Sequence, residues 1–507
     1  MGKGFFVIAV ARNPGRLFVC WLVLRSLVWV VAVCLSHPNA PLDLIEWLSW
    51  GHSWQWGYAK HPPLPAWLAD AVTRITPGRI WPVYALSYAL TALTLTAAWQ
   101  MARAYLTPSR ALLAVLALDG LMYFTNDVAE YSNNVVLNAG WAWLAVVYRS
   151  ALTTGALRWW LVAGLIFGLM LLTKYTIGVL AVCLLLYTVY VPEYRTVWRR
   201  PGPYLAALVA AGIATPHAVW LVQNDFAPFY YASARSTEVA PWWGRVFFPG
   251  QFLGGQLLLL LPVLWTLWPM LSSKQPRLTV AADVRYLDVV VLGPVLFLVA
   301  VSVVTGSLLR EIWGSPLWAF FGVWLVARFG RAVTVDEAPW HSQVVRRWVC
   351  VAVGLLMFTV VKSTFGTMLT GHPERAHFPG RALAGEVEQL WFERYGTPVR
   401  LVGGEAWRAG NIACYSPHRP TVYTSGVMGA LVMNAADCPW TSDAAANATG
   451  AVIVWDAEAI QVGQLAEIRL RFPKFVEMPT LELPVRAYGL RQMSRVGVGF
   501  VPPTDHE

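Results

Sequence analysis

Charged residues are scarce in this chain of 507 residues. Asp, Glu, Lys and Arg together make up 13% of the sequence, hydrophobic residues make up 57%, and the mean hydropathy is +0.50. So little charge excludes both an ordinary soluble protein and a disordered one. The apolar residues gather in runs, and about 20 of them are needed to cross a bilayer as one helix. The sequence therefore predicts a mainly α-helical, polytopic membrane protein.

Signatures of bound cofactors are missing as well. The nine His residues show no tight metal-ligand spacing, no Gly-rich phosphate loop is present, and no nucleophile elbow is visible. We therefore expect no required cofactor and leave a divalent metal open. The net charge of +10 comes largely from loops between apolar segments. It reflects membrane topology rather than a nucleic-acid partner.

Cysteines are few, and most of them lie in apolar segments. Four of the six fall where a thiol usually serves as small apolar filler, namely Cys20, Cys34, Cys183 and Cys350. Cys414 and Cys438 lie near the C-terminus, in a region that we expect outside the cytoplasm, where disulfides form. A disulfide between Cys414 and Cys438 and a pair of free thiols are therefore equally open interpretations.

The apolar segments predict about eleven transmembrane helices, beginning near residues 17, 81, 110, 134, 158, 176, 203, 248, 286, 313 and 346. Basic residues collect at alternate turns, and basic residues are retained on the cytoplasmic side. This alternation predicts a cytoplasmic N-terminus, and an odd number of spans places everything after residue 370 outside. The first segment lacks a small-residue cleavage site and is expected to stay as an anchor. Its Arg25 either snorkels or faces a polar interior.

The composition changes at about residue 371, where shorter apolar stretches alternate with Gly, Pro and charged residues. VRLVGG at 399–404 and AVIVW at 451–455 are typical of buried strands, and GRALAGEVEQLWFERYG at 380–396 is typical of an amphipathic helix. We therefore predict a transmembrane domain over residues 1–370 and a small soluble α/β domain, outside the membrane, over residues 371–507.

Polar residues of a different kind collect in the loops predicted to face outward. The first of these loops, DLIEWLSWGHSWQWGYAKHPPLPAW at 43–67, holds carboxylates and cations among aromatic residues. Such a loop suits a substrate with an apolar tail and a charged head. Asp43 can take a proton from an acceptor hydroxyl while nearby cations neutralise a phosphate leaving group. The candidate cations are Lys60, His61, Lys174 and Arg310. The Trp residues can stack on a sugar or form an interfacial belt, and the belt is favoured.

An acidic residue at the start of the first outer loop, followed by an aromatic stretch ending in GYAKHPP, resembles the polyprenol-phosphate-sugar glycosyltransferases of family 39. That family includes protein O-mannosyltransferases and lipid A aminoarabinose transferases, which share the class C glycosyltransferase fold. Three later segments also resemble the family: LLTKYTIG at 171–178, PHAVWLVQNDFAPFYYA at 216–232 and REIWGSPLW at 310–318. The similarity extends over most of the membrane part.

The resemblance implies an inverting hexosyl or pentosyl transferase in the inner (plasma) membrane. It implies a polyprenyl-phosphate-sugar donor and a cell-envelope lipid, glycan or protein acceptor, with transfer on the outer face. It also implies a catalytic carboxylate at Asp43, where the family usually has an Asp-Glu pair. Here the next residue is Leu44. Glu46 either replaces the missing acid in part or is a solvated charge.

Other positions depart from the family pattern. The family's Asp-His-Pro-Pro corresponds to Lys60-His61-Pro62-Pro63, which favours a phosphate contact for Lys60, although snorkelling remains open. Asn134 stands where many relatives have an acid, and an amide can bind a sugar or phosphate oxygen but cannot act as a base. Asp127 and Glu130 are close in sequence and are either contributors or solvated charges.

Two other function classes stay open at this point. A transporter or flippase for a lipid-linked sugar would also need many spans, but such proteins often show internal repeats. No clear repeat is visible, and the polar residues cluster at one surface, which favours transfer. An inactive relative that acts as a scaffold is the other alternative, because the second acid is missing.

Overall fold

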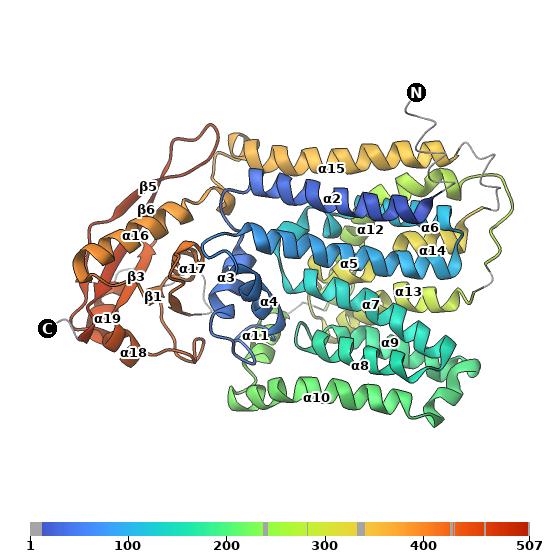
Figure 1. The fold of residues 1–507 in the computed structure, drawn as a ribbon, viewed down its shortest axis with the longest axis horizontal. Helices are drawn as coiled ribbons and strands as arrows, with labels where there is room; N and C mark the ends of the chain where they lie inside the picture. The colour runs from blue at the N-terminus through green and yellow to red at the C-terminus, as the bar shows by residue number, and fades with distance from the viewer. Residues whose placement is uncertain are drawn as a thin grey trace.

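The computed structural model describes residues 13–236, 242–280, 282–331, 340–425, 429, 431–460 and 463–504. Long helices lie side by side, and a small sheet covers one end of them (Figure 1). The helices of this bundle are α2 Pro14–Ser36, α5 Trp81–Tyr105, α6 Pro108–Leu116, α7 Asn133–Thr154, α8 Leu157–Leu171, α9 Ile177–Tyr190, α10 Gly202–Gln223, α12 Gly244–Leu271, α13 Arg285–Thr305, α14 Phe321–Phe329 and α15 Trp340–Thr370.

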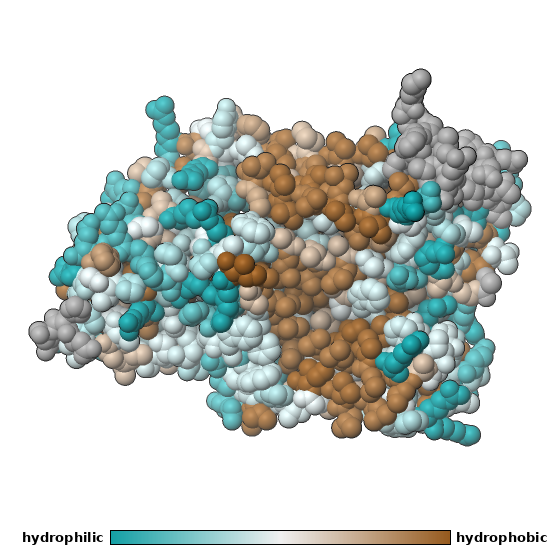
Figure 2. Space-filling model, viewed as in Figure 1, coloured by the Kyte–Doolittle hydropathy of each residue, from teal (hydrophilic) through white to brown (hydrophobic). Residues whose placement is uncertain are grey.

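The bundle has the composition of a membrane domain. Six described helices are long and apolar enough to cross a bilayer, or up to eight if each of two bent helix pairs counts as one span. Hydrophobic residues form a broad band over the bundle, with polar surface on either side of it (Figure 2). Every predicted span begins within six residues of a helix start. The count by helix length and composition is lower than the eleven predicted spans, partly because α6 has only 9 residues and α8 only 15. The predicted fold class is confirmed.

Short elements lie between the bundle and the sheet. They include α3 Leu42–Gly51, α4 Leu64–Thr73 and α11 Ala227–Ser236 (Figure 1), together with the 3-10 helix η3 Asp127–Glu130. The 3-10 helices η1 Ala117–Gly120 and η2 Met122–Phe124 lie within the bundle, where Asp119 and the Phe124 carbonyl accept hydrogen bonds from Arg25 of α2. Pro41 precedes α3 in extended conformation, and Asp43 lies in its first turn, where the helix dipole favours a carboxylate. Leu44, Ile45 and Trp47 bury one side of α3. The candidate acid is thus held on a packed helix rather than on a loop.

All six strands follow α15 and form one mixed sheet, ordered β2-β1-β3-β6-β4, with β5 also paired to β6. The strands β1 Leu401–Gly404, β2 Thr421–Thr424 and β3 Ala451–Asp456 are parallel, and β6 Met493–Val501 runs antiparallel to β3, β4 Val476–Glu477 and β5 Leu481–Pro484. Helices α16 Gly380–Tyr395, α17 Ala406–Tyr415, α18 Asp443–Thr449 and α19 Gln464–Arg471 pack on it. The two predicted strands and the predicted helix are β1, β3 and α16.

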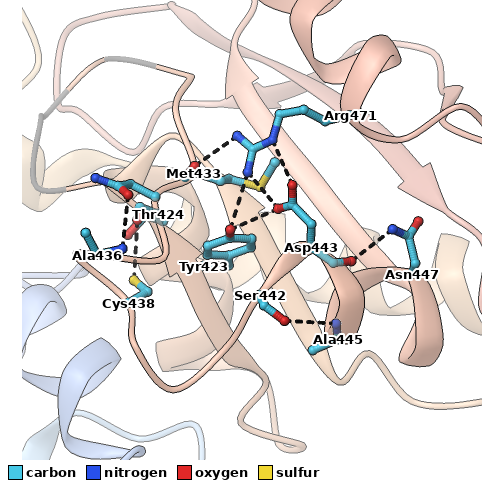
Figure 3. A network of polar contacts seen from close by, with 11 residues as sticks. Tyr423, Thr424, Met433, Ala436, Cys438, Ser442, Asp443, Ala445, Asn447 and Arg471 are labelled. Carbon is cyan, nitrogen blue, oxygen red and sulfur yellow. Dashed lines mark hydrogen bonds and ion pairs between the residues drawn. The ribbon is translucent and has the colours of Figure 1, made fainter.

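An ion pair ties the β2 edge of the sheet to its helices (Figure 3). Arg471 donates from two nitrogens to the Asp443 carboxylate, at 2.6 and 3.1 Å, and from a third to the Met433 carbonyl at 2.9 Å. Tyr423 on β2 donates to the same carboxylate at 2.9 Å. A charge-assisted, two-point pair of this kind fixes α18, α19 and β2 relative to one another.

The sheet region is also fastened to α3 and α4. Gly410 of α17 packs so closely on α3 that a Cβ there would collide with Ile45 and Ser49. Arg419, which precedes β2, forms an ion pair with the fully buried Asp70 of α4. The backbone N–H of Ala40 donates to the Tyr415 hydroxyl at 2.8 Å. These contacts hold α3 against the C-terminal region on one side while its other side packs on the bundle.

Two questions left open by the sequence are decided by the structure. Arg25 does not snorkel, because it is buried and paired with Asp119. The disulfide interpretation is wrong for this structure, since Cys414 and Cys438 are both free. Cys414 packs against the large core of the bundle, whereas Cys438 belongs to the core under β2 and β3. The Cys438 thiol instead donates to the Thr424 carbonyl at 3.3 Å (Figure 3).

Candidate functional site

Asp43, Asn134 and Lys174 come together where α3 meets the ends of α7 and α8. Lys174 lies in the turn between α8 and α9, and its ammonium donates to the Asn134 amide oxygen at 2.6 Å. Burial lowers the pKa of Lys174 to about 8, while the negative charge of Asp43 acts in the opposite direction. The half-buried Asp43 is therefore close enough to affect the lysine. This places a candidate base and a candidate phosphate-binding cation in one site.

Glu46 and Lys60 form a second group, on the neighbouring side of α3. The Lys60 ammonium forms an ion pair with the Glu46 carboxylate, and only 10% of the lysine side chain is exposed. It also lies 5.8 Å from the ring centre of Trp50 and 5.6 Å from that of Tyr231. Lys60 therefore does not snorkel to lipid headgroups. Because Glu46 follows Asp43 by three residues on a helix, the two carboxylates are neighbours on its surface.

His61 joins the two groups. Its Nδ1 lies 3.4 Å from the Asn133 amide nitrogen, and its ring centre lies 5.3 Å from that of Trp47. The aromatic residues around it divide in two. Trp47 and Trp50 are buried and pack edge to face at 5.4 Å, whereas Trp54 and Trp56 are each 44% exposed. Trp47 and Trp50 therefore belong to the packed interior of the site, whereas Trp54 and Trp56 lie partly exposed at the surface.

Glu130 and Asp127 approach the same site from η3. Desolvation by the surrounding protein, and then repulsion from Asp43 and Asp127, raises the pKa of Glu130 to about 7, although its side chain stays open to solvent. Two cations also act on Glu130 from more distant parts of the chain, Arg375 and Lys362. Neither cation is among the site residues predicted from the sequence. A signal was present for Lys362, which is a single lysine near the outer end of the last apolar run.

Arg310 comes from another segment of the bundle. It precedes the 3-10 helix η5 Glu311–Trp318, whose first carbonyl accepts hydrogen bonds from Tyr123 at 2.6 Å and Gln256 at 3.0 Å. Among the hydrogen bonds and ion pairs of the described residues, none joins Arg310 to Asp43, Lys60 or Lys174. Its phosphate-binding role stays a prediction.

The described part of the chain contains no group of three His, Cys, Asp or Glu side chains that could hold a metal ion. The prediction that no cofactor is required stays a prediction. Carboxylates, an ammonium and an amide are the functional groups that the site brings together. They can accept a proton, neutralise an oxyanion and orient a hydroxyl.

Comparison with known proteins covers both the sequence and the fold. Residues 60–220 match the family described as dolichyl-phosphate-mannose-protein mannosyltransferase. No curated protein sequence matches the chain significantly. The structure is similar to that of ArnT from Cupriavidus metallidurans bound to undecaprenyl phosphate, with a TM-score of 0.64 and 16% identity over 98% of both chains. For ArnT in the apo state the TM-score is 0.50, with 15% identity over 95% of this chain and 98% of that one.

The two comparisons agree with each other. The matched segment contains Lys60, His61, Asn134 and Lys174, and the similarity of fold extends over the sheet region as well as the bundle. The resemblance seen in the sequence is thus confirmed as a similarity. This chain is a multi-pass membrane protein whose residues 60–220 match the mannosyltransferase family and whose fold is similar to that of ArnT.

Proposed function

We propose that this protein transfers a hexose or pentose from a polyprenyl-phosphate donor to an acceptor hydroxyl in the cell envelope. The observation that carries the proposal is the proximity of Asp43 to the Lys174–Asn134 pair. A base for the incoming hydroxyl and a cation for the leaving phosphate must lie on either side of one sugar carbon. In this site they come from two elements packed together. ArnT from Cupriavidus metallidurans was solved with undecaprenyl phosphate bound, which supports a donor of that class.

The reaction then follows from the groups present. Asp43 accepts the proton of the acceptor hydroxyl while the hydroxyl oxygen bonds to the anomeric carbon. The bond between that carbon and the phosphate oxygen breaks on the opposite face, so the configuration inverts. Lys174 stabilises the negative charge left on the polyprenyl phosphate, and Asn134 holds the ammonium in place. The product is a glycosylated envelope lipid, glycan or protein, and an envelope lipid or glycan is favoured.

The same proposal includes a location. We place the protein in the inner (plasma) membrane, with a transmembrane domain over residues 1–370 and a soluble domain over 371–507 on the outer face. In support, α2 begins at the end of the bundle remote from the sheet (Figure 1). A cytoplasmic start of α2 therefore puts Asp43 and the sheet on the outer side together.

The test is a comparison of envelope lipids and glycans, by mass spectrometry, in cells with and without the protein. We expect a sugar-sized mass difference on one acceptor species. If deletion leaves every acceptor unchanged but lipid-linked sugar accumulates in the cytoplasmic leaflet, the protein is a flippase. If neither changes while a partner enzyme loses activity, it is a scaffold.

The charge state of Lys174 makes the reaction sensitive to pH. The pKa of Lys174 is about 8, which is well below the ordinary pKa of lysine. The side chain is therefore charged below pH 8 and neutral above it. Glu130, with a pKa of about 7, becomes negatively charged as the pH rises through 7. We expect kcat/KM for the donor to fall as pH rises from 7 to 9, because both changes weaken phosphate binding.

The two steps can be separated by substitution. Lys174→Arg keeps its charge at every accessible pH, so it should remove the fall near pH 8 and leave the one near pH 7. Glu130→Gln should do the reverse. An unchanged pH profile in both variants would show that neither group faces the donor phosphate.

A further inference from the structure

An apolar groove runs along α8, α9 and α10, toward the end of the bundle that lies away from the sheet (Figure 1). Its volume is about 350 Å³, whereas a single water molecule requires roughly 10–15 Å³. The lining comes from these helices, from α7 and from the 3-10 helix η4 Pro192–Arg199. Every lining residue is apolar or aromatic, so the groove suits a hydrocarbon chain.

The groove opens to the outside of the bundle and is as deep as one leaflet of a bilayer. Trp160 on its inner wall is 3% exposed, whereas Leu185 and Tyr204 at its rim are 44% and 60% exposed. Along α8 the lining extends to Phe167, and the helix begins at Leu157. At about 1.5 Å per residue this distance is about 15 Å, which is half of the roughly 30 Å hydrocarbon core. An acyl chain of one leaflet therefore matches the groove in length.

Four exposed arginines lie at the same end of these helices, namely Arg158, Arg195, Arg199 and Arg200. Two of them follow directly after Trp198, which lines the groove. Arg195 donates to the Val189 carbonyl at the end of α9, at 2.7 Å. Arg200 reaches the turn between α7 and α8, because a Cβ on Gly155 would lie 2.6 Å from its guanidinium nitrogen. The arginines thus border the end of the groove that meets the membrane surface.

The positive charge at this end has little counterpart in the protein. Among the ion pairs of the described residues, none includes one of the four arginines. Glu193 is the one acidic residue in the sequence from 142 to 207, and it pairs with Arg285 at 3.4 Å. Retention on the cytoplasmic side explains basic residues in such a loop, but it does not require an apolar groove beside them. The two features together are complementary to an anionic lipid.

We propose that this groove binds an anionic phospholipid, with one acyl chain between α8, α9 and α10 and the phosphate on the arginines. Trp198 and Tyr204, joined by a hydrogen bond of 2.9 Å from the Tyr204 hydroxyl to the Trp198 carbonyl, lie where aromatic rings usually meet headgroups. With the orientation proposed above, the lipid belongs to the cytoplasmic leaflet. Lys174 lies at the opposite end of α8, so this lipid site is separate from the candidate site and does not depend on the transfer reaction.

A matched pair of double variants tests the headgroup contact. Arg199→Gln combined with Arg200→Gln removes two charges beside the groove. Arg346→Gln combined with Arg347→Gln also removes two adjacent charges, near the start of α15 at the same end of the bundle (Figure 1). The net charge of the protein falls equally in both, so a difference between them belongs to the groove.

A second matched pair tests the position of the acyl chain. Ala181 lines the groove from α9, so Ala181→Phe fills part of the space. Val182 is the next residue of the same helix and is 37% exposed. Val182→Phe therefore places the same ring on the outside of α9. All variants should unfold at similar temperatures when no lipid is added.

The experiment is native mass spectrometry of the full-length protein after delipidation, titrated with phosphatidylglycerol or with phosphatidylcholine of the same chains. We expect one phosphatidylglycerol to be retained, with a Kd about 25-fold or more below that of phosphatidylcholine. The Arg199/Arg200 variant should raise the Kd for phosphatidylglycerol about 25-fold, or about fivefold for each arginine, and the Arg346/Arg347 variant should not change it. Ala181→Phe should abolish retention, and Val182→Phe should bind like the wild type.

Other outcomes would overturn the proposal. Equal affinity for the two lipids would show that the arginines do not hold the headgroup. Equal losses in the two double variants would indicate an effect of net charge. Unchanged binding in Ala181→Phe would place the chain elsewhere, and displacement by undecaprenyl phosphate would assign the groove to an isoprenoid carrier. If Ala181→Phe fails to fold, the exposed arginines still decide the result. Binding is measured without sugar transfer, so an inactive protein can still confirm the lipid site.

Discussion

Asp43→Asn is expected to lower the rate of sugar transfer by about 10²–10⁴-fold, the usual contribution of a positioned general base. The amide has the size and shape of the carboxylate, but it cannot take a proton from the acceptor. Donor binding should survive, because Lys174 and Asn134 remain paired. The measurement is single-turnover transfer from a labelled polyprenyl-phosphate sugar, with donor binding followed separately.

The neighbouring acids supply the controls. Glu46→Gln removes the carboxylate that pairs with Lys60, and Glu130→Gln removes one whose pKa lies near 7. Glu46→Gln should be slower than the wild type by a smaller factor than Asp43→Asn, and Glu130→Gln, which removes a negative charge, should not be slower than the wild type. If Glu46→Gln is the slower variant and Asp43→Asn transfers normally, Glu46 is the base, about one helical turn after the position that the resemblance implies. Leu44→Glu, which restores the acid next to Asp43, then tests whether the effects of the two carboxylates on the transfer rate are additive.

The elements that could be predicted are those whose signal is local. Runs of apolar residues with basic residues at alternate turns indicated the bundle, and β-rich stretches between Gly and Pro indicated β1 and β3. The fold of such segments is decided by burial of their own side chains, so a window of about 20 residues contains the necessary information.

What the sequence could not show depends on distant contacts. Lys60 turns back to Glu46 because the Tyr58–His61 segment closes on itself, with hydrogen bonds of 3.0 and 3.2 Å between the two backbones. The approach of Lys362 and Arg375 to Glu130 joins segments more than 230 residues apart. The separation of Cys414 and Cys438 depends on which side of the sheet each element packs. The spacing of residues along the chain predicts none of these three arrangements.

Asp119→Ala is expected to destabilise the bundle by about 3–5 kcal/mol, the cost of leaving one partner of a buried ion pair without the other. The Asp119 carboxylate accepts hydrogen bonds from Arg25, from Trp21 at 3.2 Å and from Trp348 at 2.9 Å. Its removal leaves the buried guanidinium of α2 without its carboxylate and takes one hydrogen-bond acceptor from each of the two indoles. Equilibrium unfolding in mixed micelles measures the change.

The size of this effect depends on burial, and two further variants test that reasoning. Arg25→Met combined with Asp119→Leu removes both charges, so it should be less destabilising than Asp119→Ala alone, because no buried charge remains. Glu482→Gln breaks an ion pair with Arg495 whose side chains are 55% and 51% exposed. It should cost no more than about 1 kcal/mol, since solvent screens such pairs.

If Asp119→Ala costs as little as Glu482→Gln, the ion pair in the bundle is hydrated and water reaches the centre of α2. That result would move Arg25 and Asp119 from the structural framework to a transport path, and the flippase alternative would then have a physical basis.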